Sequence, residues 1–351
     1  MEKLLKRKDI DWKNLDFAMM STAGSIRLDY DGEKWSEPEV MKEETISLHV
    51  GAQALHYGQA CFEGLKAFSL KDGGVGLFRP EMNARRMMKS AERICMMAPP
   101  EELFVEACLK AVELNLEYVP PYGTGASLYL RPLLIGTEPM FPVMPSSTFT
   151  FLVMVSPVGP YYKNGFSPVD ALILDGYDRA APQGTGQSKV AGNYAASLKS
   201  TLESKAKGFP INLYLDAREG RYIDEFGTSN FIGITGDNRY LTPESPSILP
   251  SITNDSLRQL AVDMGLAVSQ EPIPVSDLEQ FVEVGACGTA AIITPIASVT
   301  HGNKKVTFGN GEAGPVLASL YQELQSIQCG EVKDRHSWIT RLNPISATDE
   351  F

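Results

Sequence analysis

Cysteine and histidine are scarce in this chain of 351 residues, which has five of the first and four of the second. The cysteines are far apart, odd in number and never arranged as CxxC, so neither a disulfide framework nor a structural zinc site is supported. We therefore expect no metal and a reducing, cytoplasmic environment. The residues concerned are Cys61, Cys95, Cys108, Cys287 and Cys329, with His49, His56, His301 and His336.

Long hydrophobic runs and an excess of positive charge are also missing. No stretch of about 18 apolar residues occurs, so a transmembrane helix is not expected. The opening segment, MEKLLKRK, is charged and lacks the apolar core of a secretory signal peptide. The formal net charge of −11 opposes binding to a phosphate backbone. We expect neither nucleic acid nor a membrane as a partner.

What is present is an ordinary globular composition, 43% hydrophobic, in a chain long enough for two domains. Strand patterns and helical periodicities follow each other irregularly, which favours an α+β fold over a doubly wound sheet. Residues 1–30 and 334–351 look peripheral. Strands are expected at 127–135, 149–155, 171–174, 211–215 and 230–234, and helices at 81–95, 103–114, 253–264 and 316–327.

The segment GPYYKNGFSP, at 159–168, is rich in turn formers and follows a strongly apolar strand. It marks the expected domain boundary. We predict a smaller N-terminal α+β domain at 1–160, a linker at 161–174 and a larger C-terminal domain at 175–351. The crevice between two such domains is the default ligand site.

One lysine, Lys189, lies among glycines and small residues in PQGTGQSKVAGNY, where the backbone can approach a ligand closely. The P-loop pattern fails, because Ser188 precedes this lysine and Val190 follows it, so nucleotide binding through GTGQSK is rejected. Taken alone, Lys189 is a surface lysine on a flexible loop. The functional alternative is a Schiff-base lysine in a confined site.

Three further segments contain residues suited to an aromatic, anionic ligand, and each has an ordinary structural alternative. In DEFGTSN, Glu225 either faces solvent or stabilises a protonated ring nitrogen, with Thr228 beside it. In ILPSITN, Thr253 is the expected N-cap of a helix whose N–H groups suit a phosphate. In GACGTAAIITP, the small residues around Thr289 form either a packed turn or a close approach to a ligand.

Two more patterns combine arginine with possible anion binding. LFRPEMNARRM contains Arg79, Arg85 and Arg86, which are either exposed helix residues or include one guanidinium that binds a phosphate. Tyr129 and Arg131 are two apart in a strand and project from the same face, where they would meet a carboxylate or form an ordinary half-exposed surface.

In combination and in this order, these segments resemble the branched-chain amino-acid aminotransferases, which are fold-type IV enzymes that use pyridoxal 5′-phosphate. The resemblance covers residues 46–340, is to the larger form of the family, and implies its two-domain α+β fold, which is D-amino-acid aminotransferase-like. The motifs are LHYGQACFEGLKAF (55–68), LFRPEMNARRM (77–87), SLYLRPLLIGTEP (127–139), KVAGNY (189–194), EFGTSNF (225–231), LPSIT (249–253) and CGTAAIITP (287–295).

The resemblance implies a role for each matching residue. Lys189 would bind the cofactor covalently and carry a proton, Tyr194 would contact the cofactor's phenolic oxygen, and Glu225 would pair with its ring nitrogen. Leu249 would pack on the ring, and the phosphate would be bound by Arg86, Ile252, Thr253 and Thr289. The substrate pocket would consist of Tyr57, Phe62, Tyr129, Arg131, Tyr161, Thr228, Ala290 and Ala291. The neighbouring subunit supplies part of this pocket in the family, which implies a homodimer.

The implied reaction moves the amino group of L-leucine, L-isoleucine or L-valine to 2-oxoglutarate, giving the branched 2-oxo acid and L-glutamate. A D-amino-acid aminotransferase, an aminodeoxychorismate lyase and a non-catalytic binding protein of the same fold are the alternatives. Ser251 and Asn254 stand where a glycine and an arginine are expected beside the phosphate site. Ala291 and Thr294 stand where some relatives have a redox CxxC, so no such thiol switch is expected.

Overall fold

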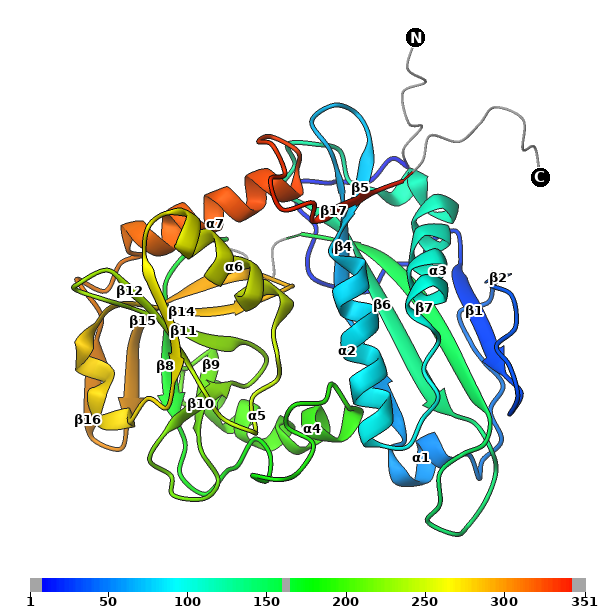
Figure 1. The fold of residues 1–351 in the computed structure, drawn as a ribbon, viewed down its shortest axis with the longest axis horizontal. Helices are drawn as coiled ribbons and strands as arrows, with labels where there is room; N and C mark the ends of the chain where they lie inside the picture. Colours follow the sequence, from blue (N-terminus) through cyan, green and yellow to red (C-terminus); the bar gives the residue numbers. More distant parts are fainter. Residues whose placement is uncertain (1–7, 160–164, 343–351) are drawn as a thin grey trace. The chain divides into compact units, whose positions relative to one another are not determined.

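The computed structural model describes residues 8–159 and 165–342 (Figure 1). The chain folds into two compact units and passes from the first to the second and back. Unit 1 comprises Met1–Tyr161 together with Ser326–Phe351, and unit 2 comprises Tyr162–Gln325.

Unit 1 is built on a sheet whose centre is a long antiparallel pair, β6 and β7, joined residue by residue along its whole length. The short β3 also pairs with β6. In spatial order the strands are β17 (Ile339–Arg341), β5 (Val75–Phe78), β4 (Leu65–Ser69), β6 (Ser127–Gly136), β7 (Phe149–Val158), β1 (Ser25–Tyr30) and β2 (Glu39–Met41), with β3 at Ala60–Phe62.

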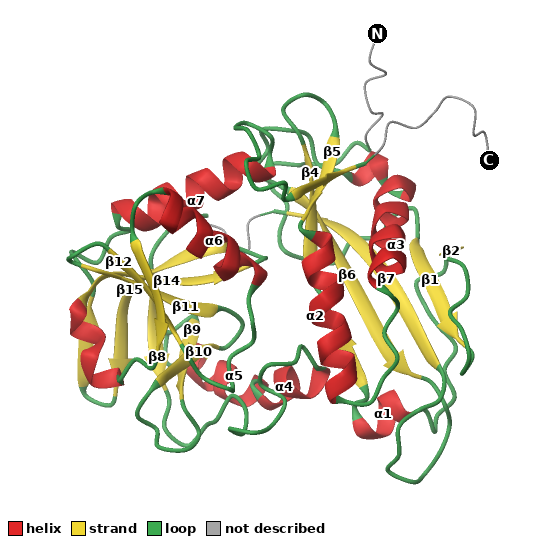
Figure 2. Ribbon diagram, in the orientation of Figure 1, coloured by secondary structure: helices red, strands yellow, loops and turns green. Residues whose placement is uncertain are grey.

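Helices α2 and α3 lie beside this sheet (Figure 2). On α3, apolar residues recur at helical spacing and are fully buried, and the ring of Phe104 packs 5.5 Å from that of Phe151 on β7. Burying one such side chain contributes about 1.5–3 kcal/mol. The helical segments of unit 1 are α1 (Gln53–Tyr57), α2 (Pro80–Arg93), α3 (Glu101–Leu114) and the 3-10 turn Leu116–Tyr118.

In unit 2 the strands β10, β9, β8, β15, β14 and β11 form a closed ring, because β10 pairs with β11 as well as with β9. Closure removes the free edges of these strands. β12, β13 and β16 extend the sheet. The bounds are β8 (Val169–Ile173), β9 (Ile211–Leu215), β10 (Ile223–Phe226), β11 (Asn230–Thr235), β12 (Arg239–Pro243), β13 (Ala267–Glu271), β14 (Phe281–Gly288), β15 (Ile292–His301) and β16 (Lys304–Thr307).

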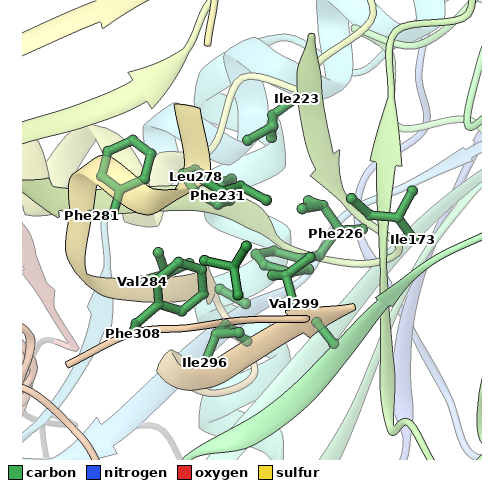
Figure 3. Close-up of a cluster of buried hydrophobic side chains, with 14 of the residues drawn as sticks. Ile173, Ile223, Phe226, Phe231, Leu278, Phe281, Val284, Ile296, Val299 and Phe308 are labelled. Atoms are coloured by element: carbon green, nitrogen blue, oxygen red, sulfur yellow. The ribbon is translucent and has the colours of Figure 1, made fainter. Parts of the chain in front are cut away.

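The core of unit 2 takes apolar side chains from every strand of the ring (Figure 3). Phe231 on β11 is fully buried and lies between the rings of Phe226 and Phe281, at 5.9 and 5.6 Å. A shift of register between Ile223 and Phe226 brings both residues into this core although they are three apart. The two polar residues between them, Asp224 and Glu225, are therefore held at a fixed place beside the core.

The helices of unit 2 lie against these strands, α5 against β9 and α6 against β13 and β14. The helical segments are α4 (Ala191–Ala196), α5 (Leu198–Ala206), α6 (Ile252–Asp263) and the 3-10 helix η2 (Val275–Gln280). α7 (Pro315–Gln328) begins in unit 2 and ends in unit 1.

The predicted strands and helices are all confirmed, with ends that differ by a few residues at most. The division of the chain differs from the expected one. The expected linker contains β8, which pairs with β15 and β9, and the C-terminal segment belongs to unit 1, because β17 pairs with β5. Unit 1 is consequently the longer unit. Of the segments expected to be peripheral, Ser25–Tyr30 and Ile339–Arg341 form β1 and β17 and are thus part of the unit 1 sheet.

Candidate active site

Lys189 lies directly before α4, and Tyr194 lies within that helix. The Lys189 Nζ atom donates a hydrogen bond to the Tyr194 hydroxyl at 2.7 Å and lies 4.9 Å from the centre of the tyrosine ring. Both residues are half-buried. The description of Lys189 as a plain surface lysine is therefore wrong, and an amine held beside a phenol in a partly enclosed place is suited to a nucleophilic role.

Glu225, on β10, is 3% exposed, so the solvent-facing alternative is wrong. Its Oε1 accepts a hydrogen bond from the Leu249 N–H at 3.0 Å, and its Oε2 accepts one from Asn230 Nδ2 at 3.0 Å. Burial raises the pKa of Glu225 to about 7, against the opposing effects of the Arg179 guanidinium, the Leu249 N–H and the Lys189 amine. This carboxyl group is thus poised to change protonation near neutral pH.

Arg179 is a buried partner of Glu225 that the sequence patterns did not indicate. Its Nε lies 2.7 Å from Glu225 Oε1, and both side chains are almost fully buried. Its Nη2 donates hydrogen bonds to the carbonyl oxygens of Gly186, at 2.6 Å, and Ser247. Arg179 thereby connects the carboxylate to the loop that leads to Lys189. The sequence offered no signal for this pairing, because the two partners are far apart in the chain.

The N-terminus of α6 follows Leu249, whose carbonyl accepts a hydrogen bond from Asn230. The N-cap is Ser251 rather than the expected Thr253, because the Ser251 hydroxyl accepts the Asn254 N–H at 3.1 Å. Ile252 and Thr253 form the buried first turn. The Asn254 side chain accepts a hydrogen bond from the Tyr240 hydroxyl at 2.7 Å, which fixes this turn against β12.

A tight turn joins β14 to β15 and consists of Thr289, Ala290 and Ala291. It ends at Ile292, a buried β-branched residue with a φ of 62°, a strained conformation that persists only where its surroundings impose it. Thr228 lies exposed in the loop after β10. Its carbonyl oxygen lies 3.8 Å from the position that a Cβ on Gly288 would take, so this loop and the turn are neighbours.

Unit 1 holds a second set of predicted residues. The Arg131 guanidinium lies 4.9 Å from the centre of the Phe62 ring and 5.3 Å from that of Tyr129, and its Nη2 donates to the Tyr129 hydroxyl at 3.0 Å. Its Nε is buried and has no hydrogen-bond partner among the described residues. An arginine with an unsatisfied donor between aromatic walls is suited to a carboxylate that carries an apolar side chain.

Two neighbours of this set were missed. Phe17 packs edge-on against Tyr129, with ring centres 5.2 Å apart, although its segment was expected to be peripheral. Gly64 has no room for a side chain, since a Cβ there would lie 2.3 Å from the Tyr129 hydroxyl oxygen. Its place within the motif CFEG was the available signal for this close approach.

Arg86 differs from the other two arginines of its segment. Its Nε and Nη2 donate to the two oxygens of Glu63 at 2.8 and 2.7 Å, and Glu63 is fully buried. Glu63 also accepts a hydrogen bond from Asn83 at 2.8 Å. By contrast, Arg85 pairs with the half-exposed Glu101, and Arg79 stacks on Trp338. Arg86 is thus the arginine that a buried carboxylate orients.

Tyr57 ends α1 with its side chain largely exposed, and its hydroxyl donates to the carbonyl of Phe141. Tyr161 lies outside the described residues. The structure thus brings Lys189, Tyr194, Glu225 and Leu249 together in unit 2, and Phe62, Tyr129 and Arg131 together in unit 1. Cys287 is fully buried, and burial raises its pKa above the usual range.

The donor set of unit 2 fits a phosphorylated pyridine aldehyde better than a metal. A lysine amine faces the aldehyde chemistry, a buried carboxyl group within electrostatic range of that amine suits a ring nitrogen, and α6 presents a helix N-terminus. Within residues 8–159 and 165–342, no three histidine, cysteine or acidic side chains gather as metal ligands would. Nor does that part of the chain contain a helix of sufficient length and apolarity to traverse a bilayer.

Comparisons with known proteins identify the family. Residues 60–299 match the model of amino-transferase class IV. The chain is 45% identical over 342 residues to the branched-chain-amino-acid aminotransferase of Haemophilus influenzae, covering 95% of this chain and 99% of that protein.

Solved structures agree with this likeness. The branched-chain amino acid aminotransferase of Escherichia coli matches with a TM-score of 0.75 and 28% identity, over 87% of this chain and 97% of the other. The T.th. branched-chain amino acid aminotransferase with pyridoxamine 5′-phosphate matches with a TM-score of 0.78 and 26% identity, over 92% of this chain and 100% of the other.

Proposed function

The chain belongs to the class IV aminotransferases, and from that premise we propose that it transfers the amino group between L-leucine, L-isoleucine or L-valine and 2-oxoglutarate. The products are the branched 2-oxo acid and L-glutamate. The chain is a transaminase and its cofactor is pyridoxal 5′-phosphate. The observation that carries the proposal is the arrangement in unit 2 of Lys189, Tyr194 and a buried Glu225.

When bound, the cofactor supplies an electron-accepting ring that stabilises negative charge at the substrate's α-carbon. Lys189 would hold the cofactor covalently, and its amine would carry the proton to and from that carbon. Tyr194, whose hydroxyl lies 2.7 Å from the Lys189 amine, contacts the phenolic oxygen. Glu225, with Arg179 and the Leu249 N–H on its oxygens, keeps a proton on the ring nitrogen.

Phosphate binding draws on the first turn of α6. The initial N–H groups of a helix have no partners within it, and Ser251 satisfies that of Asn254, so the N–H groups of Ile252 and Thr253 suit the phosphate. Thr289 adds a hydroxyl. The resemblance assigns the phosphate's cation to Arg86 of unit 1, and Leu249 would pack on the ring. Ser251 and Asn254, the two departures from the family pattern, support this turn through the N-cap and through Tyr240.

Substrate recognition draws on the aromatic and arginine set of unit 1. The buried, unsatisfied Nε of Arg131 suits a carboxylate, and the rings of Phe62 and Tyr129 suit a branched aliphatic chain. One methylene discriminates by only about 1–3 kcal/mol, so Leu, Ile and Val should all be accepted. The other described residues that the resemblance assigns to substrate binding are Tyr57 in unit 1 and Thr228, Ala290 and Ala291 in unit 2.

A homodimer is part of the proposal. The side chains of Leu55, Tyr57, Phe141, Val143 and Met144, in α1 and the loop after β6, are 45–85% exposed. Large apolar side chains gathered on exposed segments favour association with another protein surface. The Phe141→Asp substitution should therefore shift the protein towards monomers in sedimentation analysis. The cytoplasmic location stays a prediction.

The alternatives of the same fold are not favoured. The relatives of high identity and coverage are branched-chain enzymes. The non-catalytic binding protein is opposed by the intact set of Lys189, Tyr194, Glu225 and Arg86.

The test is a half-reaction on the purified protein loaded with pyridoxal 5′-phosphate, followed by the visible absorption of the bound cofactor. Loss of that absorption with L-leucine but not with D-alanine is the expected result. The Lys189→Ala variant should bind cofactor without covalent attachment and should lack turnover. Loss of absorption with D-alanine alone would assign the protein to the D-specific branch, and full activity of Lys189→Ala would overturn the assigned nucleophile.

A further inference from the structure

Asn193 connects the loop before Lys189 to the helix that carries Tyr194. Its Nδ2 donates to the carbonyl oxygens of Thr185 and Ser188, both at 2.8 Å. Its Oδ1 accepts a hydrogen bond from the Thr185 hydroxyl at 2.6 Å. A side-chain amide can donate two hydrogen bonds and accept two, and three of these four are made with the loop. The residue is 9% exposed.

The hydrogen bonds of Asn193 connect two points of the backbone that lie next to the proposed catalytic residues. Ser188 is the residue directly before Lys189, and Asn193 is the residue directly before Tyr194. The two connected points are therefore the ones next to the amine and the phenol that meet at 2.7 Å. Loops of this composition are among the most mobile parts of a chain, so a bond at this position restricts the backbone on which the Lys189 side chain stands.

We propose that Asn193 is a positioning residue, which fixes Lys189 against Tyr194 by holding the Thr185–Ser188 backbone to the start of α4. The inference rests on the proposed function of Lys189. In this role Asn193 touches neither substrate nor cofactor. The alternative is that the amide only stabilises the fold, as many buried asparagines do.

Unit 1 contains a matched control for that alternative. Asn115 is fully buried, its Nδ2 donates to the carbonyls of Gly24 and Ala111 at 3.0 and 2.8 Å, and its Oδ1 accepts the Ala23 N–H at 2.9 Å. This amide makes the same pattern of two donated bonds and one accepted bond. It lies in the other unit, and no residue of the proposed site takes part in it.

The experiment compares Asn193→Ala with Asn115→Ala in the cofactor-loaded protein. Three quantities are measured: the melting temperature, the pH midpoint of the visible absorption of the bound cofactor, and kcat and KM for L-leucine. The titratable and charged groups near the Lys189 nitrogen in unit 2 include Tyr194 and Glu225, on which Arg179 and Asp224 also act, and all of these remain in both variants.

Both variants should melt at a lower temperature. Only Asn193→Ala should shift the pH midpoint, by about half a unit to one unit, because the Tyr194 hydroxyl is then displaced from the Lys189 nitrogen and from the phenolic oxygen that it contacts. Its kcat should fall by about tenfold to a hundredfold with little change in KM, since a small misplacement of a reacting group has that effect. An unchanged midpoint and kcat, with the same melting loss as Asn115→Ala, would overturn the proposal.

Thr185→Val provides a second variant if Asn193→Ala does not fold. It removes the hydroxyl that binds Asn193 Oδ1 with little change in volume, and it should shift the midpoint in the same direction by less. No shift in Thr185→Val would count against the proposal. Reduction with borohydride and peptide mapping of the wild type separates the two claims. Cofactor found on a residue other than Lys189 refutes the proposed function, whereas cofactor on Lys189 with unshifted variants refutes only the role of Asn193.

Discussion

Each unit holds a buried arginine–glutamate pair, and the two pairs have different surroundings. In unit 1, Arg86 binds both oxygens of Glu63, whose side chain is fully buried while that of Arg86 is 12% exposed. In unit 2, the Arg179 guanidinium pairs with one oxygen of Glu225, and its Nη2 donates hydrogen bonds to two carbonyl oxygens. The more exposed partner is thus Arg86 in unit 1, whereas in unit 2 the Lys189 amine acts electrostatically on the Glu225 carboxyl group.

A buried ion pair does not by itself indicate which of its two partners acts on a ligand. The neighbours of each group decide this. The Glu63 carboxylate accepts hydrogen bonds from Arg86 and Asn83, so its role is to support Arg86. Arg179 pairs with Glu225 and donates hydrogen bonds to the carbonyls of Gly186 and Ser247, so it supports Glu225. Removing the supporting and the acting member of each pair should thus have different consequences.

Replacing the acting carboxylate of unit 2 should have the largest effect. Glu225→Gln cannot keep a proton on the ring nitrogen, and kcat with L-leucine should fall by about a thousandfold. The measurement is steady-state kinetics at saturating cofactor. A kcat within about threefold of the wild type would remove the assigned role of Glu225.

Replacing its supporting arginine should lower stability in a pH-dependent way. Arg179→Met leaves a buried carboxylate without its counter-charge, which should lower the free energy of unfolding of the cofactor-free protein by about 3 kcal/mol at pH 8. At pH 5 the loss should be smaller, because Glu225, whose pKa burial raises, is then protonated and neutral. Denaturation by urea at both pH values measures the difference, and equal losses would contradict the assignment of this charge.

A third effect concerns the pH dependence of wild-type stability. The pKa of Glu225 is about 7 in the folded, cofactor-free protein, against 4.5 for the ordinary carboxyl group. The folded state therefore binds this proton more tightly than the unfolded state does. The resulting contribution to the free energy of unfolding is complete below pH 4.5 and is lost as pH rises through 7. The wild type should lose about 3 kcal/mol more than Glu225→Gln over this range. Parallel curves for the two proteins would show that Glu225 does not titrate there.

The elements with strong local patterns could be predicted from the sequence. The stripe of α6 and the alternation in β6 and β9 place these elements within one or two residues of their observed ends. The short β17 has no periodic signal, and its pairing with β5 joins parts of the chain far apart in sequence. The assignment of the C-terminal segment to unit 1 depends on that pairing, so local reasoning could not supply it.

Within the candidate site, the sequence indicated groups but not their partners. Lys189 and Tyr194 are five apart and were singled out together with Glu225, yet Arg179 was not. Its pairing with Glu225 depends on the register shift in β10 and on a loop conformation, neither of which has a local sequence signal. Phe17 was missed for the same reason, since its contact with Tyr129 is set by the return of the N-terminal segment to the sheet.

The smallest effect is expected at the supporting carboxylate of unit 1. Glu63→Gln retains the shape of the side chain but loses the charge that orients Arg86. If Arg86 binds the phosphate, the dissociation constant for pyridoxal 5′-phosphate should rise about tenfold, as expected for one weakened charge-assisted hydrogen bond. Binding of pyridoxal, which has no phosphate, should not change.

The matched control is Glu101→Gln, which removes the carboxylate partner of Arg85, the next residue on the same helix. That pair is exposed, and exposed pairs contribute little, so cofactor affinity should stay at the wild-type value. Fluorescence titration of the cofactor-free proteins measures both constants. Because kcat at saturating cofactor should be nearly normal in Glu63→Gln and very low in Glu225→Gln, the two variants separate the two pairs. Equal weakening of pyridoxal and its phosphate would mean that Glu63 supports the fold of unit 1 rather than the orientation of Arg86.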